Sequence, residues 1–255
     1  MFGKKNVAAV VAEFLGTAVL TVLILSVRYS SVALPFFIAA VAGLVIIIMM
    51  VALIDVSGAN FNPALTLALW TARKASTART AFYIAAQLLG GWVAYYLFTY
   101  LINTKLPAVG GNYNQRVLVA EALGAGIFAF VWAAAMFQKQ SNAIRASIAG
   151  IGFMIGIIVA SSFASSISTM GIINPAVALG VRTWVWGTYV LGPVLGAVIG
   201  VNIYSLLFVD NKGQKSMKTS FANVAASFSG GNKKVVSSKA TTKKKPASRR
   251  STSKK

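Results

Sequence analysis

The sequence has 255 residues, of which 57% are apolar and only 11% are charged. Soluble domains carry charge on about a quarter of their residues, so this composition excludes a water-soluble globular protein and predicts a polytopic membrane protein. Cysteine and histidine are both absent from the sequence, which excludes disulfides, the usual zinc and haem sites, and catalysis by a Cys or His side chain. We therefore expect no enzyme activity, no metal and no cofactor.

Six apolar segments are long enough to cross a bilayer, which needs about 20 residues per helix. They are residues 7–27, 33–54, 80–103, 116–137, 144–167 and 186–209. Because Lys and Arg accumulate on the cytoplasmic side, the topology can be read from the connecting loops, where an inside N-terminus gives seven cations inside against four outside. We predict an integral protein of the plasma membrane with both termini in the cytoplasm.

The positive charge is concentrated at the C-terminus. Of 24 basic residues, thirteen follow Asp210. We expect residues 1–210 to form the transmembrane domain and residues 211–255 a disordered polybasic tail. Such a tail is attracted to anionic lipids, whereas nucleic-acid binding would depend on the same charges without a folded reader. We favour anionic lipids as its partner and expect no specific nucleic acid.

The chain contains an internal repeat. Ala-Glu-Phe-Leu-Gly-Thr at 12–17 and Asn-Pro-Ala-Leu-Thr-Leu-Ala at 62–68 correspond to Ala-Glu-Ala-Leu-Gly-Ala at 120–125 and Asn-Pro-Ala-Val-Ala-Leu-Gly at 174–180. The two copies, about 7–103 and 116–209, each hold three spans. An odd number of spans gives the copies opposite orientations, which is the inverted-repeat plan of many transport proteins.

Each copy also contains a triplet that predicts the start of a helix: Asn62-Pro63-Ala64 and Asn174-Pro175-Ala176. Asn is a preferred N-cap, and Pro is favoured at the first helical position. The two helices run to about Trp70 and Val181 and reach roughly 12–15 Å, which is half of a hydrocarbon core of about 30 Å. Two half-helices that enter from opposite faces would meet near the membrane midplane.

These motifs resemble the aquaporin and glycerol-facilitator family, the major intrinsic proteins. The resemblance covers about residues 7–209 and includes Gln87, Gly90-Gly91 and Gly192-Pro193. It implies an all-α membrane protein with six transmembrane helices and two re-entrant half-helices, assembled as a homotetramer with one pore per subunit. It also implies that residues 1–210 form a passive channel for water and small neutral solutes.

The paired half-helices explain how such a site selects neutral molecules. Their N-termini carry partial positive charge, which repels a cation, while a water or hydroxyl oxygen accepts hydrogen bonds from Asn62 and Asn174. Inverted repeats and broken helices also occur in secondary transporters, which remain an alternative, as does a membrane scaffold with a closed pore.

Glu13 and Glu121 are acidic residues inside spans, at matching positions of the repeat. A carboxylate within the membrane is a functional candidate, and a proton relay is one interpretation. The resemblance implies instead that the equivalent glutamates hold the re-entrant loops through hydrogen bonds to the backbone. We favour this scaffold role, because an unpaired buried charge is costly.

The resemblance places an outer selectivity filter at four positions counted from the two asparagines. They are Ala42, Ser162, Gly171 and Val177. Water-selective members of the family have aromatic, His and Arg side chains there, whereas this chain has none. We predict a wide, uncharged filter without a fixed cation, open to glycerol-sized solutes. The alternatives are an alignment shifted by one residue, or a space filled by Phe163 or Met170.

Asp55 lies seven residues before Asn62, and we expect it in the inner vestibule. Its carboxylate would either bring negative charge toward the permeation path or pair with Arg73 or Arg79. We favour the pair, because intramembrane and vestibular charges usually find a partner.

Overall fold

The computed structural model describes residues 3–108, 112–164 and 170–209. Six helical segments in this part of the chain are long and apolar enough to cross a membrane. They are α1 (Lys4–Arg28), α2 (Pro35–Ser57), α4 (Thr77–Leu101), α5 (Gln115–Phe137), α6 (Asn142–Ala164) and the pair formed by the π-helical turn η2 (Trp186–Leu191) and α8 (Gly192–Leu207). The predicted all-α fold with six spans is confirmed. The predicted tail, residues 211–255, lies outside the described residues.

Two short helices complete the fold, α3 (Pro63–Thr71) and α7 (Pro175–Gly180). Each begins at the Pro of an Asn-Pro-Ala triplet and ends within one residue of the predicted position. Each exits through a residue in the left-handed region, Arg73 (φ 57°) after α3 and Arg182 (φ 64°) after α7. The two half-helices therefore have matching starts and matching exits, as expected of an inverted repeat.

The first five long segments are regular helices, whereas the sixth begins as η2. Pro193 stands at the start of α8 and has no N–H to donate to the carbonyl four residues earlier. A π-helical turn is one way in which a helix absorbs such a missing hydrogen bond.

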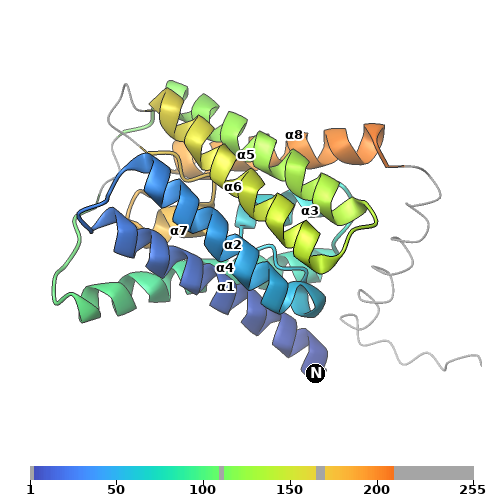
Figure 1. Cartoon of the computed structure of the whole chain (residues 1–255), viewed down its shortest axis with the longest axis horizontal. Helices are drawn as coiled ribbons and strands as arrows, with labels where there is room; N and C mark the ends of the chain where they lie inside the picture. Colours follow the sequence, from blue (N-terminus) through green and yellow to red (C-terminus); the bar gives the residue numbers. More distant parts are fainter. Residues whose placement is uncertain (1–2, 109–111, 165–169, 210–255) are drawn as a thin grey trace, which may run out of the picture.

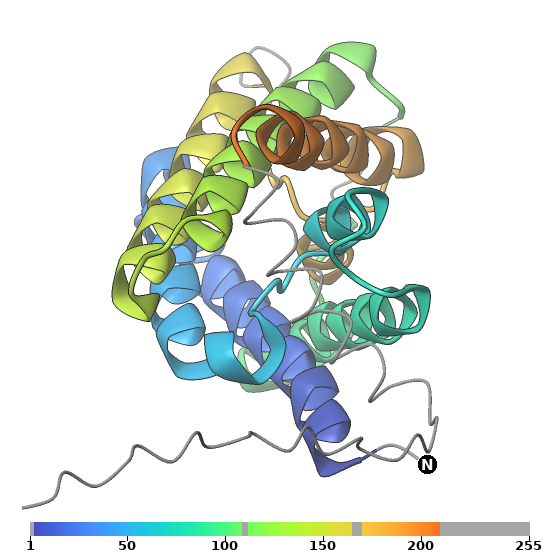
Figure 2. The same ribbon diagram turned by 90° about the vertical axis from the view of Figure 1, so that its right-hand side faces the viewer.

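The half-helix α3 lies between α8 and α4 at the edge of the bundle (Figure 2). Within the first half α1 packs on α2 and α4, and within the second half α5 packs on α6 and α8. The half-helices are exchanged between the halves, because α3 packs on α8 and α7 packs on α4. The start of α1 and the end of α8 lie at the same end of the bundle, which we call the N-terminal face (Figure 1).

Glycine allows the close helix contacts within each half. A Cβ on Gly90 of α4 would lie 2.5 Å from the carbonyl oxygen of Phe14 in α1, and one on Gly196 of α8 would collide with the carbonyl of Ala122 in α5. Phe14 and Ala122 each follow the glutamate of their repeat. The same backbone contact therefore occurs in both halves, and it depends on a residue without a side chain.

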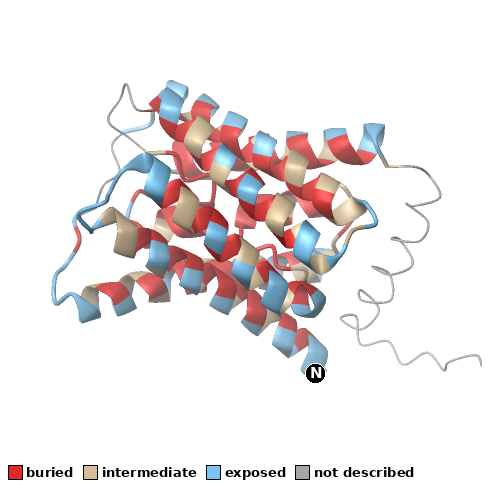
Figure 3. Ribbon diagram, in the orientation of Figure 1, coloured by how far each residue is buried: buried red, intermediate tan, exposed pale blue. Residues whose placement is uncertain are grey.

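The outer surface of the bundle is apolar. On α1, for example, residues at every fourth position are exposed, and they form one stripe along the helix because residues four apart lie on the same face. They are Val7, Val11, Leu15, Val19 and Leu23. Figure 3 shows exposed positions along the outside of the helices and buried ones toward the centre. Apolar surface of this extent fits a lipid environment and not water.

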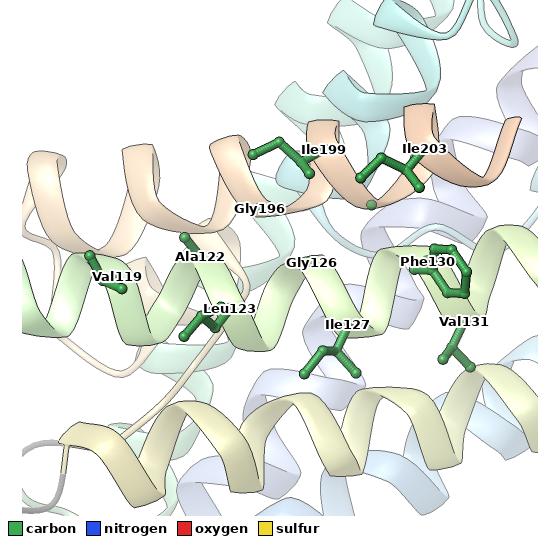
Figure 4. Close-up of a pocket in the computed structure, with 11 residues that line it drawn as sticks. Val119, Ala122, Leu123, Gly126, Ile127, Phe130, Val131, Gly196, Ile199 and Ile203 are labelled. Carbon is green, nitrogen blue, oxygen red and sulfur yellow. The ribbon is translucent and has the colours of Figure 1, made fainter. Parts of the chain in front are cut away.

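A shallow groove of about 430 Å³ runs along this surface between α5 and α8 (Figure 4). Its lining consists of hydrocarbon side chains, among them Leu123, Ile127 and Ile199, together with Gly126 and Gly196. The groove follows from the close glycine contact just described, since two glycines leave no side chains to fill the space between the helices. The groove is therefore an apolar feature of the outer surface.

Candidate functional site

The two re-entrant loops meet at Asn62 and Asn174. Asn62 caps α3, with its Oδ1 accepting from the backbone N–H of Ala64 at 2.9 Å. Asn174 caps α7 in the same way, accepting from Ala176 at 3.0 Å. Capping uses the oxygen of each amide, so each Nδ2 group is turned away from its own helix.

Each Nδ2 group binds the loop of the other repeat. Asn62 donates to the carbonyl of Ile173 at 3.0 Å, and Asn174 donates to the carbonyl of Phe61 at 2.9 Å. An amide NH₂ has two hydrogens, and these bonds use one from each asparagine. The second hydrogen of each amide remains for another acceptor. The sequence predicts the amides as donors, but it contains no sign of these reciprocal bonds.

Phe61 and Ile173 are held in an unusual backbone conformation, with φ of 50° and 48°. This left-handed region disfavours bulky and β-branched residues, and such strain persists only where the surroundings enforce it. The loops enforce it from both sides. The N–H of Phe61 donates to Glu13 and that of Ile173 donates to Glu121, while their carbonyls accept from the opposite asparagine.

Glu13 is fully buried and accepts four hydrogen bonds. Its donors are the hydroxyl of Ser57 at 2.7 Å, the backbone N–H groups of Asn60 at 3.0 Å and Phe61 at 2.7 Å, and the side-chain amide of Gln87 at 2.7 Å. These partners connect α1 to the end of α2, to the loop and to α4. Such a network fixes the path of the first re-entrant loop.

Glu121 plays the matching part in the second repeat, with fewer partners. It is fully buried, and its two oxygens accept from the backbone N–H groups of Ile172 at 2.7 Å and Ile173 at 2.6 Å. The position that corresponds to Gln87, three residues before the contact glycine of α4, is occupied in α8 by Pro193. The second loop therefore lacks the side-chain amide that binds the first glutamate.

The four predicted filter positions are uncharged, but the structure does not show them as an open ring. Ala42 and Val177 have no exposed surface, and Gly171 is buried with Ala160 and Ser161 packed against it. Ser162 is exposed and lines a cavity of about 310 Å³ at the end of α6. Ala42 and Val177 belong to the apolar core, and the wide, uncharged filter stays a prediction.

The two side chains proposed to fill the filter space instead are Phe163 and Met170. Phe163 is 60% exposed, so its ring does not occupy the interior. Met170 is half-buried and packs against the apolar core. Arg182 does not replace a filter arginine either, since it is exposed and its guanidinium lies 5.2 Å from the ring centroid of Tyr95.

The predicted ion pair of Asp55 needs correction. Its carboxylate is exposed and accepts from the side-chain amide of Asn142 at 2.8 Å, not from Arg73 or Arg79. Arg79 instead donates to the carbonyl of Ser57 and to the hydroxyl of Tyr83. The reason is that Ser57 ends α2, and the unpaired carbonyls and negative dipole end of a helix C-terminus attract a cation.

The comparisons with known proteins agree with this geometry. Residues 3–204 match the model of the major intrinsic protein family. The chain belongs to that family. It is 33% identical over 179 residues to a probable TIP-type aquaporin of Medicago truncatula, which covers 66% of this chain and 69% of that protein. Aquaporin NIP3-1 of Arabidopsis thaliana is 30% identical over 241 residues, covering 86% of this chain and 71% of that protein.

A solved structure has the same fold. The X-ray structure of the aquaglyceroporin from Plasmodium falciparum superposes with a TM-score of 0.65 and 20% identity, covering 79% of this chain and 96% of that one. Family membership and the six spans make this protein an integral membrane channel for water and small solutes.

Proposed function

We propose that water and small uncharged polar solutes, including molecules of glycerol size, pass through each subunit along the two re-entrant loops and are bound at mid-path by Asn62 and Asn174. The observation that supports this proposal is that both side-chain amides have a fixed orientation with one N–H unused. Each amide is held by its helix cap and by one hydrogen bond to the opposite loop, which leaves one N–H per amide for a solute. Two fixed donors suit a neutral oxygen acceptor.

Charge selection is expected at the same place. A solute that reaches the asparagines meets donors and the positive N-terminal end of α3, so a cation loses hydration without gaining acceptors. The outer filter positions Ala42, Ser162, Gly171 and Val177 provide no charge. Cation exclusion in this channel then depends on the interior and not on the outer filter.

The remaining assignments concern topology and partners. We place both termini in the cytoplasm, because that orientation puts the excess of loop cations inside, and we place the protein in the plasma membrane. The family resemblance supports a homotetramer with one pore per subunit. The tail from residue 211 would hold its cations against anionic lipids of the inner leaflet.

Reconstitution into proteoliposomes tests the function directly. We expect osmotic water flux and uptake of glycerol that are unaffected when ion gradients are collapsed with ionophores. Uphill uptake that stops with the gradient would identify a secondary transporter, and liposomes no more permeable than empty ones would identify a closed scaffold. Vesicle swelling in a series of polyols of increasing length measures the size limit.

The asparagines have a test of their own. Asn62→Ala and Asn174→Ala remove the pore donor and the bond to the opposite loop, so we expect each to lower water flux about tenfold, the factor for roughly 1.4 kcal/mol of hydrogen bonding. Asn112→Ala, at an exposed loop position, is the matched control. Flux that stays at the wild-type level in both variants would remove the asparagines from the path.

A further inference from the structure

A small cavity of about 40 Å³ lies between the first re-entrant loop and α5. Gly58 and Asn60 of the loop form one wall, and Trp132 and Met136 of α5 form another. The loop runs from the end of α2 at the N-terminal face to Asn62, where the two half-helices meet. The cavity therefore lies in the half of the path between that face and the asparagines.

Trp132, which lines this cavity, carries an unused hydrogen-bond donor. The indole Nε1 of Trp132 is buried and has no hydrogen-bond partner within the described part of the chain, and the whole residue is only 3% exposed. Buried polar groups almost always have a partner, and leaving one without costs about 1–3 kcal/mol. A cavity needs about 10–15 Å³ to hold one water, so the available space accepts a water molecule or a single hydroxyl group.

Neighbouring side chains hold the indole in place and give the cavity a basic lining. The ring of Trp132 lies 6.4 Å from that of Phe137, and the ammonium of Lys74 lies 5.1 Å from the Phe137 centroid. Lys74 and Arg79 both line the cavity. Two basic side chains beside the site disfavour a cation there, whereas a neutral oxygen can accept from the indole.

We propose that Trp132 Nε1–H is a second hydrogen-bonding station for the permeating solute, between the N-terminal face and the asparagine pair, and that its ring limits solute size. The occupant is water or the hydroxyl of a small neutral alcohol. The inference rests on the proposed channel function. Part of the selection by solute size would then occur at Trp132, on the other side of the midplane from the small outer filter residues.

Two substitutions separate the donor from the ring. Trp132→Phe removes the N–H and keeps an aromatic ring, so we expect water flux to fall about two- to tenfold, the effect of one neutral hydrogen bond. Trp132→Ala also removes the bulk, so we expect uptake of four- and five-carbon polyols to rise relative to water. Trp92→Phe is the matched control, because Trp92 is 48% exposed on the outer face of α4.

Stopped-flow light scattering on proteoliposomes, normalised to reconstituted protein, provides both readouts. A wild-type protein without any flux contradicts the channel itself. The proposal is overturned if the wild type conducts, Trp132→Phe has the same water flux as Trp92→Phe, and Trp132→Ala takes up no more polyol than the wild type. The indole would then bind a static water. A loss of chloride conductance in Trp132→Phe with unchanged water flux would also overturn it, since the site would then bind an anion.

Discussion

Phe61 and Ile173 each form hydrogen bonds with both halves of the molecule. Each donates its N–H to the glutamate of its own repeat and offers its carbonyl to the asparagine of the other. Their left-handed backbone would be unfavourable in isolation. Because each bond constrains the same peptide units, the position of one asparagine depends on the loop of the opposite repeat.

Val177 is one of the four positions at which we predict the outer filter. Val177→Arg introduces the side chain that the family usually has there, and a fixed cation in a confined site of low dielectric repels other cations with little screening. We expect polyol uptake to fall more than water flux, and any proton or cation leak to fall most. Solute-resolved swelling and a pH-sensitive dye inside the vesicles measure the two effects.

The control for this change is Val177→Leu, which adds bulk without charge. Val177 has no exposed surface in the structure, so both substitutions must displace neighbours, and only the arginine should reduce cation leak. A wild type that already excludes glycerol, together with an unchanged ratio of water to solute in Val177→Arg, would show that Val177 does not face the filter.

Among the elements, α4 and α8 occupy equivalent places but support their loops unequally. Gln87 of α4 binds Glu13 at 2.7 Å and the hydroxyl of Thr66 at 2.9 Å, and Thr66 in turn donates to the carbonyl of Asn62 at 2.9 Å. In the second repeat Pro193 and Ala178 stand at the corresponding positions. The first half-helix is therefore anchored by a side-chain network that the second does not have.

Gln87→Leu tests this anchoring. The substitution keeps the volume of the side chain but leaves Glu13 and Thr66 each without one partner, which should destabilise the protein by about 1–3 kcal/mol and lower water flux. Thermal unfolding in detergent and vesicle flux measure the two consequences. Gln115→Leu, exposed at the start of α5, should leave both unchanged; equal effects of the two variants would mean that the network adds nothing.

The contact between α5 and α8 depends on one glycine. A Cβ on Gly196 would collide with the carbonyl of Ala122, and backbone atoms cannot move aside as a flexible side chain can. We expect Gly196→Ala to lower the free energy of unfolding by about 1–3 kcal/mol, measured by thermal melting in detergent. Gly3→Ala has nothing within 4 Å of the added Cβ and should be neutral, so a neutral result at Gly196 as well would contradict the tight contact.

For the whole molecule, the two halves are joined through exchanged half-helices. Because α3 packs on α8 and α7 packs on α4, neither half can bury its re-entrant loop without the other. The pore is then a product of the whole bundle. We expect the two repeats expressed as separate chains to conduct only after they associate.

The tail adds charge to this molecule without any apolar pattern that could pack on the channel. Removing residues 212–255 should therefore leave water flux within about twofold of the full-length value while weakening binding to vesicles that contain anionic lipid, since each cation near such a surface contributes about 1 kcal/mol. Flux assays and vesicle co-sedimentation of a detergent-free nanodisc preparation test this. A truncated protein that inserts, is stable and does not conduct would instead show that the tail gates the pore.

The sequence by itself determined the helices and, to within about three residues, their ends. Span lengths follow from hydrophobicity, the starts of α3 and α7 follow from the Asn-Pro pairs, and the opposed halves follow from an odd number of spans per repeat. These features are local, because a helix and its cap are settled by residues within a few positions of one another. The repeated motifs also identified Asn62, Asn174, Glu13 and Glu121 as candidate site residues from the sequence.

Only the tertiary structure decided what these residues contact. The bonds from Asn62 to Ile173 and from Asn174 to Phe61 join groups 111 and 113 residues apart, and no local pattern encodes such a pairing. Packing also decided that Ala42, Gly171 and Val177 are buried. It placed Asp55 beside Asn142, while Arg79 bound the C-terminal end of α2. Side-chain size is fixed by the sequence, whereas empty space depends on which neighbours the fold brings near.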